Sequence, residues 1–190
     1  MTISASDGFL QAKQDIQITV GDNNEAPTIS SDNTVVISEN VTELAVVYKI
    51  LATDPDANTT LTYSISGGAD AALFNIDALT GAVTFRASPN FEVAADAGAN
   101  NVYDITVRAS DGMLYVDKAV AISVTNINES PYITSVQSST TPENVSTVLP
   151  IYTLTAADPD ANTTLSYSIV GGADAALFNI NASTGAVTFK

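Results

Sequence analysis

The chain repeats itself without gaps, and this self-similarity constrains its fold more than any other feature of the sequence. Asn24-Glu25-Ala26-Pro27 recurs as Asn128-Glu129-Ser130-Pro131, an offset of 104 positions (128 − 24). Residues 54–85 and their counterparts 158–189 differ at only four positions. Because about 100 residues make one small domain, the sequence predicts domain-sized units in series rather than one large fold.

The offset divides the chain into three parts. We expect residues 1–24 to be the C-terminal strands of one unit, because Ser6-Asp7-Gly8 corresponds to Ser110-Asp111-Gly112. Residues 25–128 are predicted to be one complete unit, and residues 129–190 the N-terminal part of a further unit. The chain is therefore expected to be a window on a longer tandem array.

The apolar pattern within a unit predicts β-strands. Residues 61–65 and 103–109 alternate apolar with polar side chains, which is the period of a half-buried strand. Gly67-Gly68 and Asp111-Gly112 supply turns, and only residues 70–74 suggest a helical turn. About seven short strands per hundred residues are typical of an antiparallel β-sandwich, so the predicted fold is all-β. The expected core includes Tyr63, Phe74, Val83 and Phe85.

The net charge of the chain limits the classes of partner that it is expected to bind. It has 21 acidic against 6 basic residues, a formal charge of −15, and neither cysteine nor histidine. A surface of this sign disfavours nucleic acid and anionic membranes as partners and favours cations. No apolar run approaches the ~20 residues of a membrane span, so no membrane insertion is expected. A purely solubilising acidic surface is the alternative, but these acids recur in register rather than scattering.

Enzymatic activity is not expected. A glycosidase needs two carboxylates across a cleft, whereas these acids lie in loops copied in every unit, from which catalysis gains nothing. A nucleophile relay of the Ser-His-Asp or Cys-His kind lacks its histidine and cysteine.

The repeated Asp-Pro-Asp loops favour a hard divalent cation. Proline fixes φ, so Asp54-Pro55-Asp56 and Asp158-Pro159-Asp160 present paired carboxylates from a stiff, non-helical loop. Ca²⁺ takes six to eight oxygen ligands, which two domain ends and a linker can supply together. An EF-hand loop is excluded because Thr59 and Ile65 replace its required glycine and glutamate. The remaining alternative is an Asp/Asn turn that caps its own backbone.

The ordered set of motifs resembles the cadherin repeat, in its bacterial form, over nearly the whole chain. The motifs that carry the resemblance are Ser38-Glu39-Asn40, Ala52-Thr53-Asp54-Pro55-Asp56, Leu73-Phe74-Asn75-Ile76-Asp77, Asn90-Phe91-Glu92, Ala109-Ser110-Asp111-Gly112 and Asn126-Ile127-Asn128-Glu129-Ser130-Pro131. The resemblance implies tandem seven-stranded Greek-key, cadherin-like (Ig-like) β-sandwiches, in which Ca²⁺ binds where two domains meet.

The resemblance also implies which residues hold the metal. At the first joint they are Asp22, Asn24, Glu25, Asp54, Asp56, Asn58 and Asp111. At the second joint they are Glu39, Asn90, Glu92, Asn126, Asn128, Glu129, Asp158, Asp160 and Asn162. Glu143, the counterpart of Glu39 in the next unit, is a further expected metal residue. The linkers are one residue shorter than the animal pattern, and asparagine replaces the usual aspartate at positions 90 and 126. We therefore expect one or two ions per joint rather than three.

The expected function is that of a calcium-binding spacer or stalk in a bacterial surface or secreted adhesin, located outside the cell, with neighbouring repeats as its partners. Glycosylation sequons at Asn40, Asn58 and Asn128 fall on or beside expected metal positions, where a glycan would block the ion, and this favours a bacterial source. Three alternatives for partners remain open. One is polysaccharide binding by exposed aromatics (Tyr48, Tyr115 and Tyr152), another is homophilic contact between repeats, and the third is head-to-tail self-association of the incomplete end units.

Overall fold

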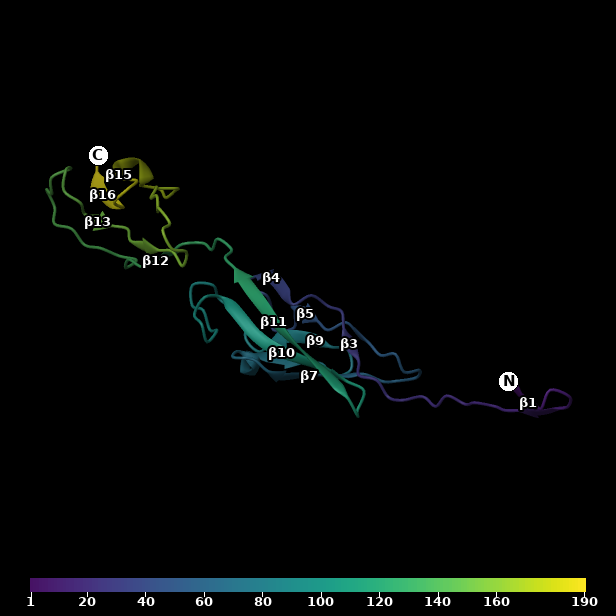
Figure 1. Cartoon of the computed structure of the whole chain (residues 1–190). Coiled ribbons are helices and arrows are strands. Elements are labelled where there is room, and N and C mark those ends of the chain that lie inside the picture. The colour runs from purple at the N-terminus through teal and green to yellow at the C-terminus, as the bar shows by residue number, and fades with distance from the viewer.

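The computed structural model describes residues 1–190 and shows an elongated molecule with the chain termini at opposite ends (Figure 1). Besides strands it contains two single turns of 3-10 helix, Ala71–Leu73 and Ala175–Leu177, and no α-helix, which confirms the all-β expectation. None of its helical segments is long and apolar enough to cross a membrane. The strands are β1 (Thr2–Ser6), β2 (Gln11–Asp15), β3 (Thr28–Ile29), β4 (Thr34–Ser38), β5 (Tyr48–Lys49), β6 (Ala52–Thr53), β7 (Thr62–Gly67), β8 (Phe74–Ile76), β9 (Ala82–Phe85), β10 (Val102–Ser110), β11 (Tyr115–Thr125), β12 (Tyr132–Ile133), β13 (Tyr152–Thr153), β14 (Ala156–Ala157), β15 (Phe178–Ile180) and β16 (Ala186–Phe189).

Strands β3 to β11 form a two-sheet sandwich in the middle of the molecule. One layer is the four-stranded sheet β4-β11-β10-β7. The remaining strands form the three-stranded sheet β5-β9-β8 and a separate pair, β3-β6. β10 and β11 are a long antiparallel hairpin, while β4 runs parallel to β11. β4 and β7 are therefore the edges of the larger sheet, and each has a single hydrogen-bonded neighbour.

The core of the sandwich follows the alternation seen in the sequence. Every second residue of β10 is buried, from Tyr103 to Ala109. The ring of Tyr103 packs edge-on against that of Phe85, with 5.1 Å between the ring centroids. The ring centroids of Phe85 and Phe74 lie 4.4 Å apart. Such tilted and edge-to-face pairs suit aromatic quadrupoles and bury large apolar areas. The expectation that Phe74, Val83 and Phe85 are core residues is confirmed, and Tyr63 packs half-buried against them.

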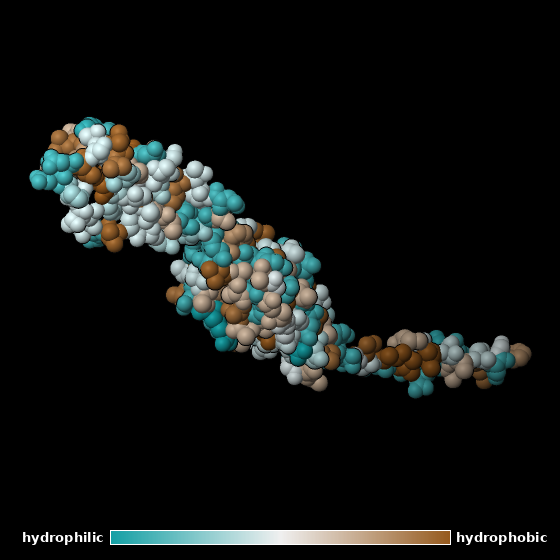
Figure 2. Space-filling view, turned by 90° about the vertical axis from the view of Figure 1, so that its left-hand side faces the viewer, coloured by the Kyte–Doolittle hydropathy of each residue, from teal (hydrophilic) through white to brown (hydrophobic).

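The N-terminal hairpin stands apart from the sandwich. β1 pairs with β2 from Thr2↔Asp15 to Ser6↔Gln11, and this pair has no other strand beside it. An extended segment connects it to β3 (Figure 1). Figure 2 shows apolar side chains on the surface of this narrow arm, and Phe9 and Val20 are 96% and 89% exposed.

Residues 129–190 keep only part of the strand pattern of residues 25–128. They contain the pair β12-β14 and the three-stranded sheet β13-β16-β15, which correspond to β3-β6 and β5-β9-β8. Residues 138–142 and 166–171, the counterparts of β4 and β7, are not strands. The reason is pairing: β4 bonds only to β11 and β7 only to β10, and residues 129–190 contain no counterpart of either partner.

Candidate metal centres

Glu39 is the most deeply buried acid at the second joint. It directly follows β4 and is 1% exposed. Its Oε2 accepts a hydrogen bond from the Phe91 backbone N at 2.8 Å, and its Oε1 accepts one from the Ile127 backbone N at 2.8 Å. A buried carboxylate requires such partners. Glu39 thus fixes the loop after β9 and the linker after β11 to the end of β4.

Two further acids meet Glu39. Carboxylate oxygens of Glu39, Glu92 and Glu129 all lie within 4.8 Å of one another. Burial, followed by the charges of Glu39, Glu129 and Asp160, raises the pKa of Glu92 above its ordinary value. One oxygen each of Glu92 and Glu129 (Oε2) is buried without any hydrogen-bond partner. Unpartnered acceptors among like charges are unfavourable in isolation, and they are what a bound cation would satisfy.

The following unit contributes to the same joint through its Asp-Pro-Asp loop. The Glu129 backbone N donates to Asp160 Oδ2 at 2.7 Å, and the Asp160 backbone N donates to Asp158 Oδ1 at 3.0 Å. The Asn128 side chain donates to the Glu129 carbonyl at 3.1 Å. Acids from two successive units and from the linker between them are therefore held together.

Two asparagine side chains complete the polar shell of the second joint. Asn126 Nδ2 donates to Glu92 Oε1 at 3.1 Å, and Asn40 Nδ2 donates to Glu129 Oε1 at 2.6 Å. Sequence reasoning missed the contact of Asn40, although the recurring Glu-Asn pair was the signal for it. Asn90 does not join this shell, because its Oδ1 accepts from the Val93 backbone N at 2.6 Å and so caps its own turn.

The first joint repeats the linker half of this arrangement. Carboxylate oxygens of Asp22, Glu25 and Asp56 lie within 4.8 Å of one another. The Glu25 backbone N donates to Asp56 at 2.9 Å, and the Asp56 backbone N donates to Asp54 Oδ1 at 2.9 Å. Burial, then the charges of Asp56, Asp22 and Asp54, raise the pKa of Glu25. Asp54 Oδ2 is buried without a hydrogen-bond partner, like the Oε2 atoms of Glu92 and Glu129 at the second joint.

Asp111 has two roles at the first joint. Its Oδ1 accepts from the backbone N of Met113 and of Leu114, each at 2.6 Å, and these bonds lower the pKa of its carboxyl group. It therefore caps the turn between β10 and β11. Its Oδ2 accepts from Asn24 Nδ2 at 2.7 Å, so the turn also contacts the linker.

Two of the expected positions have a backbone explanation. Asn58 and Asn162 both have a φ of +65°, a left-handed conformation in which asparagine is enriched. The recurrence of asparagine there is therefore explained without a metal. Glu143 is exposed and lies in neither acidic cluster. The counterparts of the residues that donate to Glu39 would be numbered 195 and 231, outside residues 1–190.

The prediction that Tyr48 is an exposed aromatic is wrong. Tyr48 is 7% exposed, and its hydroxyl donates to the Asp32 carbonyl at 2.7 Å. In β5, which pairs with β9, this ring points into the core. Tyr152, its counterpart, is half-buried. Tyr115 is 55% exposed, but the Arg108 guanidinium lies 3.6 Å from its ring centroid and covers one face.

Comparison with known proteins agrees with this geometry. The family model described as "Cadherin domain" matches residues 33–127, half of the chain. Human Protocadherin Fat 4 is 30% identical over 195 residues, covering 95% of this chain and 4% of that protein. Mouse Cadherin EGF LAG seven-pass G-type receptor 2 is 31% identical, covering 86% of this chain and 6% of that protein. The chain thus spans a small fraction of the length of these relatives.

The fold is also seen in solved structures. The crystal structure of human Protocadherin-24 EC1-2 (form II) superposes with a TM-score of 0.65 at 24% identity, covering 88% of this chain and 80% of that one. Cadherin domains are non-enzymatic extracellular repeats that occur in tandem and generally bind Ca²⁺ at the linkers between them. The match of residues 33–127, together with the acidic joints on both sides of that segment, shows that the chain belongs to the cadherin domain family.

Proposed function

We propose that Ca²⁺ binds at both joints of this chain and stiffens the array. The observation that carries the proposal is the pair of buried, unpartnered oxygens of Glu92 and Glu129 beside the buried carboxylate of Glu39. Carboxylate and carbonyl oxygens are the ligands that Ca²⁺ prefers. The residues that would hold the ions at the second joint are Glu39, Glu92, Asn126, Asn128, Glu129, Asp158, Asp160 and Asn162, with one or two ions expected.

The first joint is proposed to bind more weakly within residues 1–190. Its linker and lower acids are present, namely Asp22, Asn24, Glu25, Asp54, Asp56, Asn58 and Asp111. Residues 1–24 contain no counterparts of Glu39 and Glu92, so fewer oxygens from residues 1–190 alone surround the ion. Because affinity for Ca²⁺ depends on the number and charge of the ligands, the second joint should fill first.

Stiffening follows from electrostatics. Without a divalent cation, the acids gathered at a joint repel one another and the linker between the units can bend. With Ca²⁺, the same acids are bridged and the two units are locked end to end. At a free Ca²⁺ concentration ten times Kd, each site would add about 1.4 kcal/mol of stability by mass action. This is appreciable against a typical domain stability of ~5–15 kcal/mol.

The proposed context is a spacer or stalk within a large adhesin, divided into residues 1–24, 25–128 and 129–190. A bacterial surface or secreted protein is part of this proposal, and it rests on the short linkers and on the sequons that coincide with acidic joints. The relatives reported above are animal proteins, so the absence of N-glycan at Asn58 in protein from its native source is the test of this point.

The test of metal binding is calorimetric titration with Ca²⁺ of the whole chain, of Asp160→Ala and of Asp104→Asn. Asp104 is exposed and its side chain lies in neither acidic cluster, so its variant is the matched charge control. We expect heat of binding from the parent chain and from Asp104→Asn, and a weakened second-joint site in Asp160→Ala. Equal titrations for all three proteins, or no heat from any, would overturn the proposal.

Polysaccharide binding is not favoured by any observation. Tyr48 belongs to the core, Tyr152 is half-buried, and one face of Tyr115 is covered by Arg108. None of these three tyrosines therefore provides the flat, exposed aromatic face on which a sugar could bind. Homophilic contact between repeats stays a proposal, which sedimentation of longer arrays with and without Ca²⁺ would test.

A further inference from the structure

The loop that carries Glu92 is long and contains no regular secondary structure. It joins β9 to β10 and comprises residues 86–101. Loops longer than about 12–15 residues without strands or helices are uncommon in compact domains and are usually functional. A carboxylate in such a loop can meet those of Glu39 and Glu129 only if other side chains hold the loop in place. The contacts of this loop therefore decide where a proposed metal ligand lies.

Three successive peptide planes around Glu92 are each held by a side chain. The first and third are held by the bonds described above, from the Phe91 backbone N to Glu39 and from the Val93 backbone N to Asn90. The second is held by Asn101, whose Nδ2 donates to the Phe91 carbonyl at 2.9 Å. Because peptide groups are planar, fixing the three planes fixes the backbone dihedral angles of Phe91 and Glu92.

The backbone of Asn101 is itself attached to the sandwich. Its backbone N donates to Asp96 Oδ1 at 2.9 Å, and its carbonyl accepts from the Val124 backbone N at 2.8 Å. Asp96 and Val124 are 5% and 4% exposed, so both partners are buried. The amide of Asn101 thus reaches the loop from a backbone that is bonded to β11.

Asparagine at position 101 satisfies both the backbone and the loop. Its φ is +60°, a left-handed conformation that glycine, asparagine and aspartate tolerate best. Glycine has no side-chain donor, and neither has an ionised aspartate. Asn101 Oδ1 is buried without a hydrogen-bond partner. An amide with an unused buried acceptor costs stability, so stability alone does not explain this residue, whereas its bond to Phe91 does.

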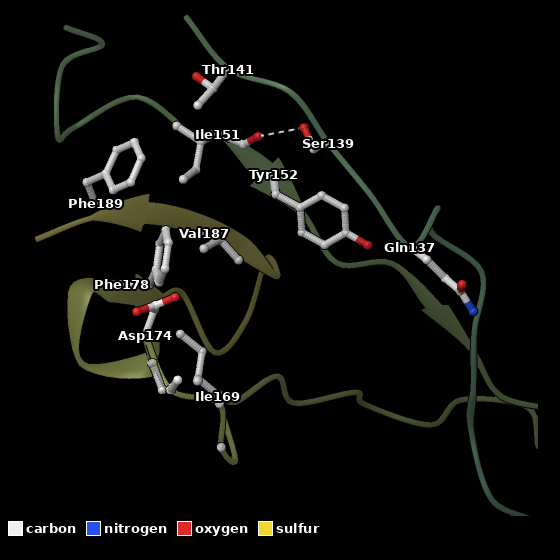
Figure 3. A pocket seen from close by; sticks show the side chains of 14 residues that line it. Gln137, Ser139, Thr141, Ile151, Tyr152, Ile169, Asp174, Phe178, Val187 and Phe189 are labelled. Atoms are coloured by element: carbon white, nitrogen blue, oxygen red, sulfur yellow. Dashed lines mark hydrogen bonds between the residues drawn. The ribbon is translucent and has the colours of Figure 1, made fainter. Parts of the chain in front are cut away.

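A second buried acid holds the later part of the loop. Asp70 is 3% exposed, and its two oxygens accept from the backbone N of Ala97 and of Asp104, each at 2.7 Å. Asp174, its counterpart, is exposed beside the pocket shown in Figure 3, and the counterparts of Ala97 and Asp104 would be numbered 201 and 208. Asp70 thus joins the later part of the loop to β10, while the part around Glu92 depends on Glu39 and Asn101.

We propose that Asn101 is a positioning residue of the metal centre at the second joint. Its amide holds the peptide group between Phe91 and Glu92, so that the Glu92 carboxylate faces those of Glu39 and Glu129. The Asn101 side chain bonds to the backbone and to none of these carboxylates, so it acts on the metal only through Glu92. This inference rests on the calcium binding proposed above.

The test is calorimetric titration with Ca²⁺ of the whole chain, of Asn101→Gly and of Ala99→Gly. Glycine keeps the left-handed backbone at position 101 and removes the donor without adding charge. Ala99 lies in the same loop with φ of +49° and is exposed, so Ala99→Gly is the matched control for an added glycine. Loss of a group that orients a metal ligand typically weakens binding 10–100-fold. We expect second-joint binding about tenfold weaker in Asn101→Gly and unchanged in Ala99→Gly.

The first joint is an internal reference in the same titrations. Its acids Asp22, Glu25 and Asp56 belong to the linker and loop at the opposite end of the central sandwich (Figure 1). Binding there should be the same in all three proteins. If the parent chain takes up no Ca²⁺, the proposed function fails and this inference fails with it. If the parent chain binds Ca²⁺ and Asn101→Gly binds it equally well, only the inference fails.

A double-mutant cycle separates positioning from a general loss of structure. If Asn101 acts through Glu92, then Asn101→Gly should have little further effect on Ca²⁺ affinity in the Glu92→Gln background. A variant that merely destabilises the sandwich would weaken binding by the same factor in both backgrounds. Equal factors would therefore overturn the assignment of Asn101 as a positioning residue.

Amide hydrogen exchange in EGTA tests the positioning without metal. The Phe91 N–H donates to Glu39, and local opening of the loop exposes it to solvent. Its exchange should be about fivefold or more faster in Asn101→Gly than in the parent chain, which corresponds to the loss of one hydrogen bond. Exchange at Val107, which is fully buried in β10, should not change. Equal exchange of the Phe91 N–H in both proteins would overturn the inference.

Discussion

Replacing Glu39 with alanine should destabilise the central sandwich even when no metal is present. Glu39 is 1% exposed, and its two oxygens accept backbone hydrogen bonds from Phe91 and Ile127, each 2.8 Å long. Alanine leaves both N–H groups without their acceptor. A buried donor left unsatisfied costs about 1–3 kcal/mol, so the two together cost about 2–6 kcal/mol. This is a large share of the ~5–15 kcal/mol that typically separates a folded domain from its unfolded state.

The assay is thermal and urea unfolding of the parent chain and of Glu39→Ala in EGTA. For a domain of about 100 residues, 1 kcal/mol corresponds to a shift in Tm of about 4–8 °C, so a fall of at least about 8 °C is expected. Glu43→Ala is the matched control, because Glu43 lies in the same segment and is exposed. If Glu39→Ala and Glu43→Ala melt together in EGTA, the buried carboxylate does not hold the loop and the linker, and the reasoning fails.

Three further predictions follow from individual contacts. In EGTA, Glu92→Gln should melt no lower than the parent chain, because it removes a charge that its neighbours repel. In millimolar Ca²⁺ it should melt lower than the parent chain, because a proposed metal ligand is lost. The same rank order of melting points in both buffers would contradict this prediction. Gly68→Ala should destabilise more than Gly112→Ala. Both glycines have positive φ, which costs a side chain about 1–2 kcal/mol, but only at Gly68 would the new Cβ lie 2.4 Å from the backbone of Asp104 and Ile105; equal urea midpoints would refute it. Asp117→Asn should cost at most ~1 kcal/mol at pH 7, since its ion pair with Arg108 is exposed. Arg108 lowers the pKa of Asp117, so this stabilisation is present above the ordinary aspartate value of 3.8 and should vanish as the pH falls below it, which urea unfolding across pH 2–7 would show.

Much of the fold and of the candidate site could be predicted from the sequence because the relevant signals are local. Alternation along β10 marked its buried face, and the Asp-Pro-Asp loops marked the acids that the structure places at the joints. The burial of Tyr48 was not predictable in this way. β5 is only two residues long, so it gives no alternation from which an inward face could be recognised, and its pairing with β9 decides the direction of the ring.

The contacts at the joints were also beyond local reasoning. Glu39 meets Ile127, and Asn40 meets Glu129, across nearly a whole unit of sequence. The repetition of acids at fixed positions indicated that they act together. Which oxygen receives a backbone donor and which is left without one depends on how the loop after β9, the linker and the following unit pack against one another.

Comparing the two repeats separates what the sequence determines from what the tertiary structure decides. Residues 62–67 and 166–171 are identical at four of six positions, yet the first segment is a strand beside β10 and the second, without such a neighbour, is not. Asn40 and Asn144 share a left-handed backbone, with φ of 60° and 59°, while Glu39 before the first is buried and Glu143 before the second is exposed. Backbone conformation at a turn is set by the residues in it, so the sequence alone determines it. Strand pairing and burial need a distant partner, so only the tertiary structure decides them.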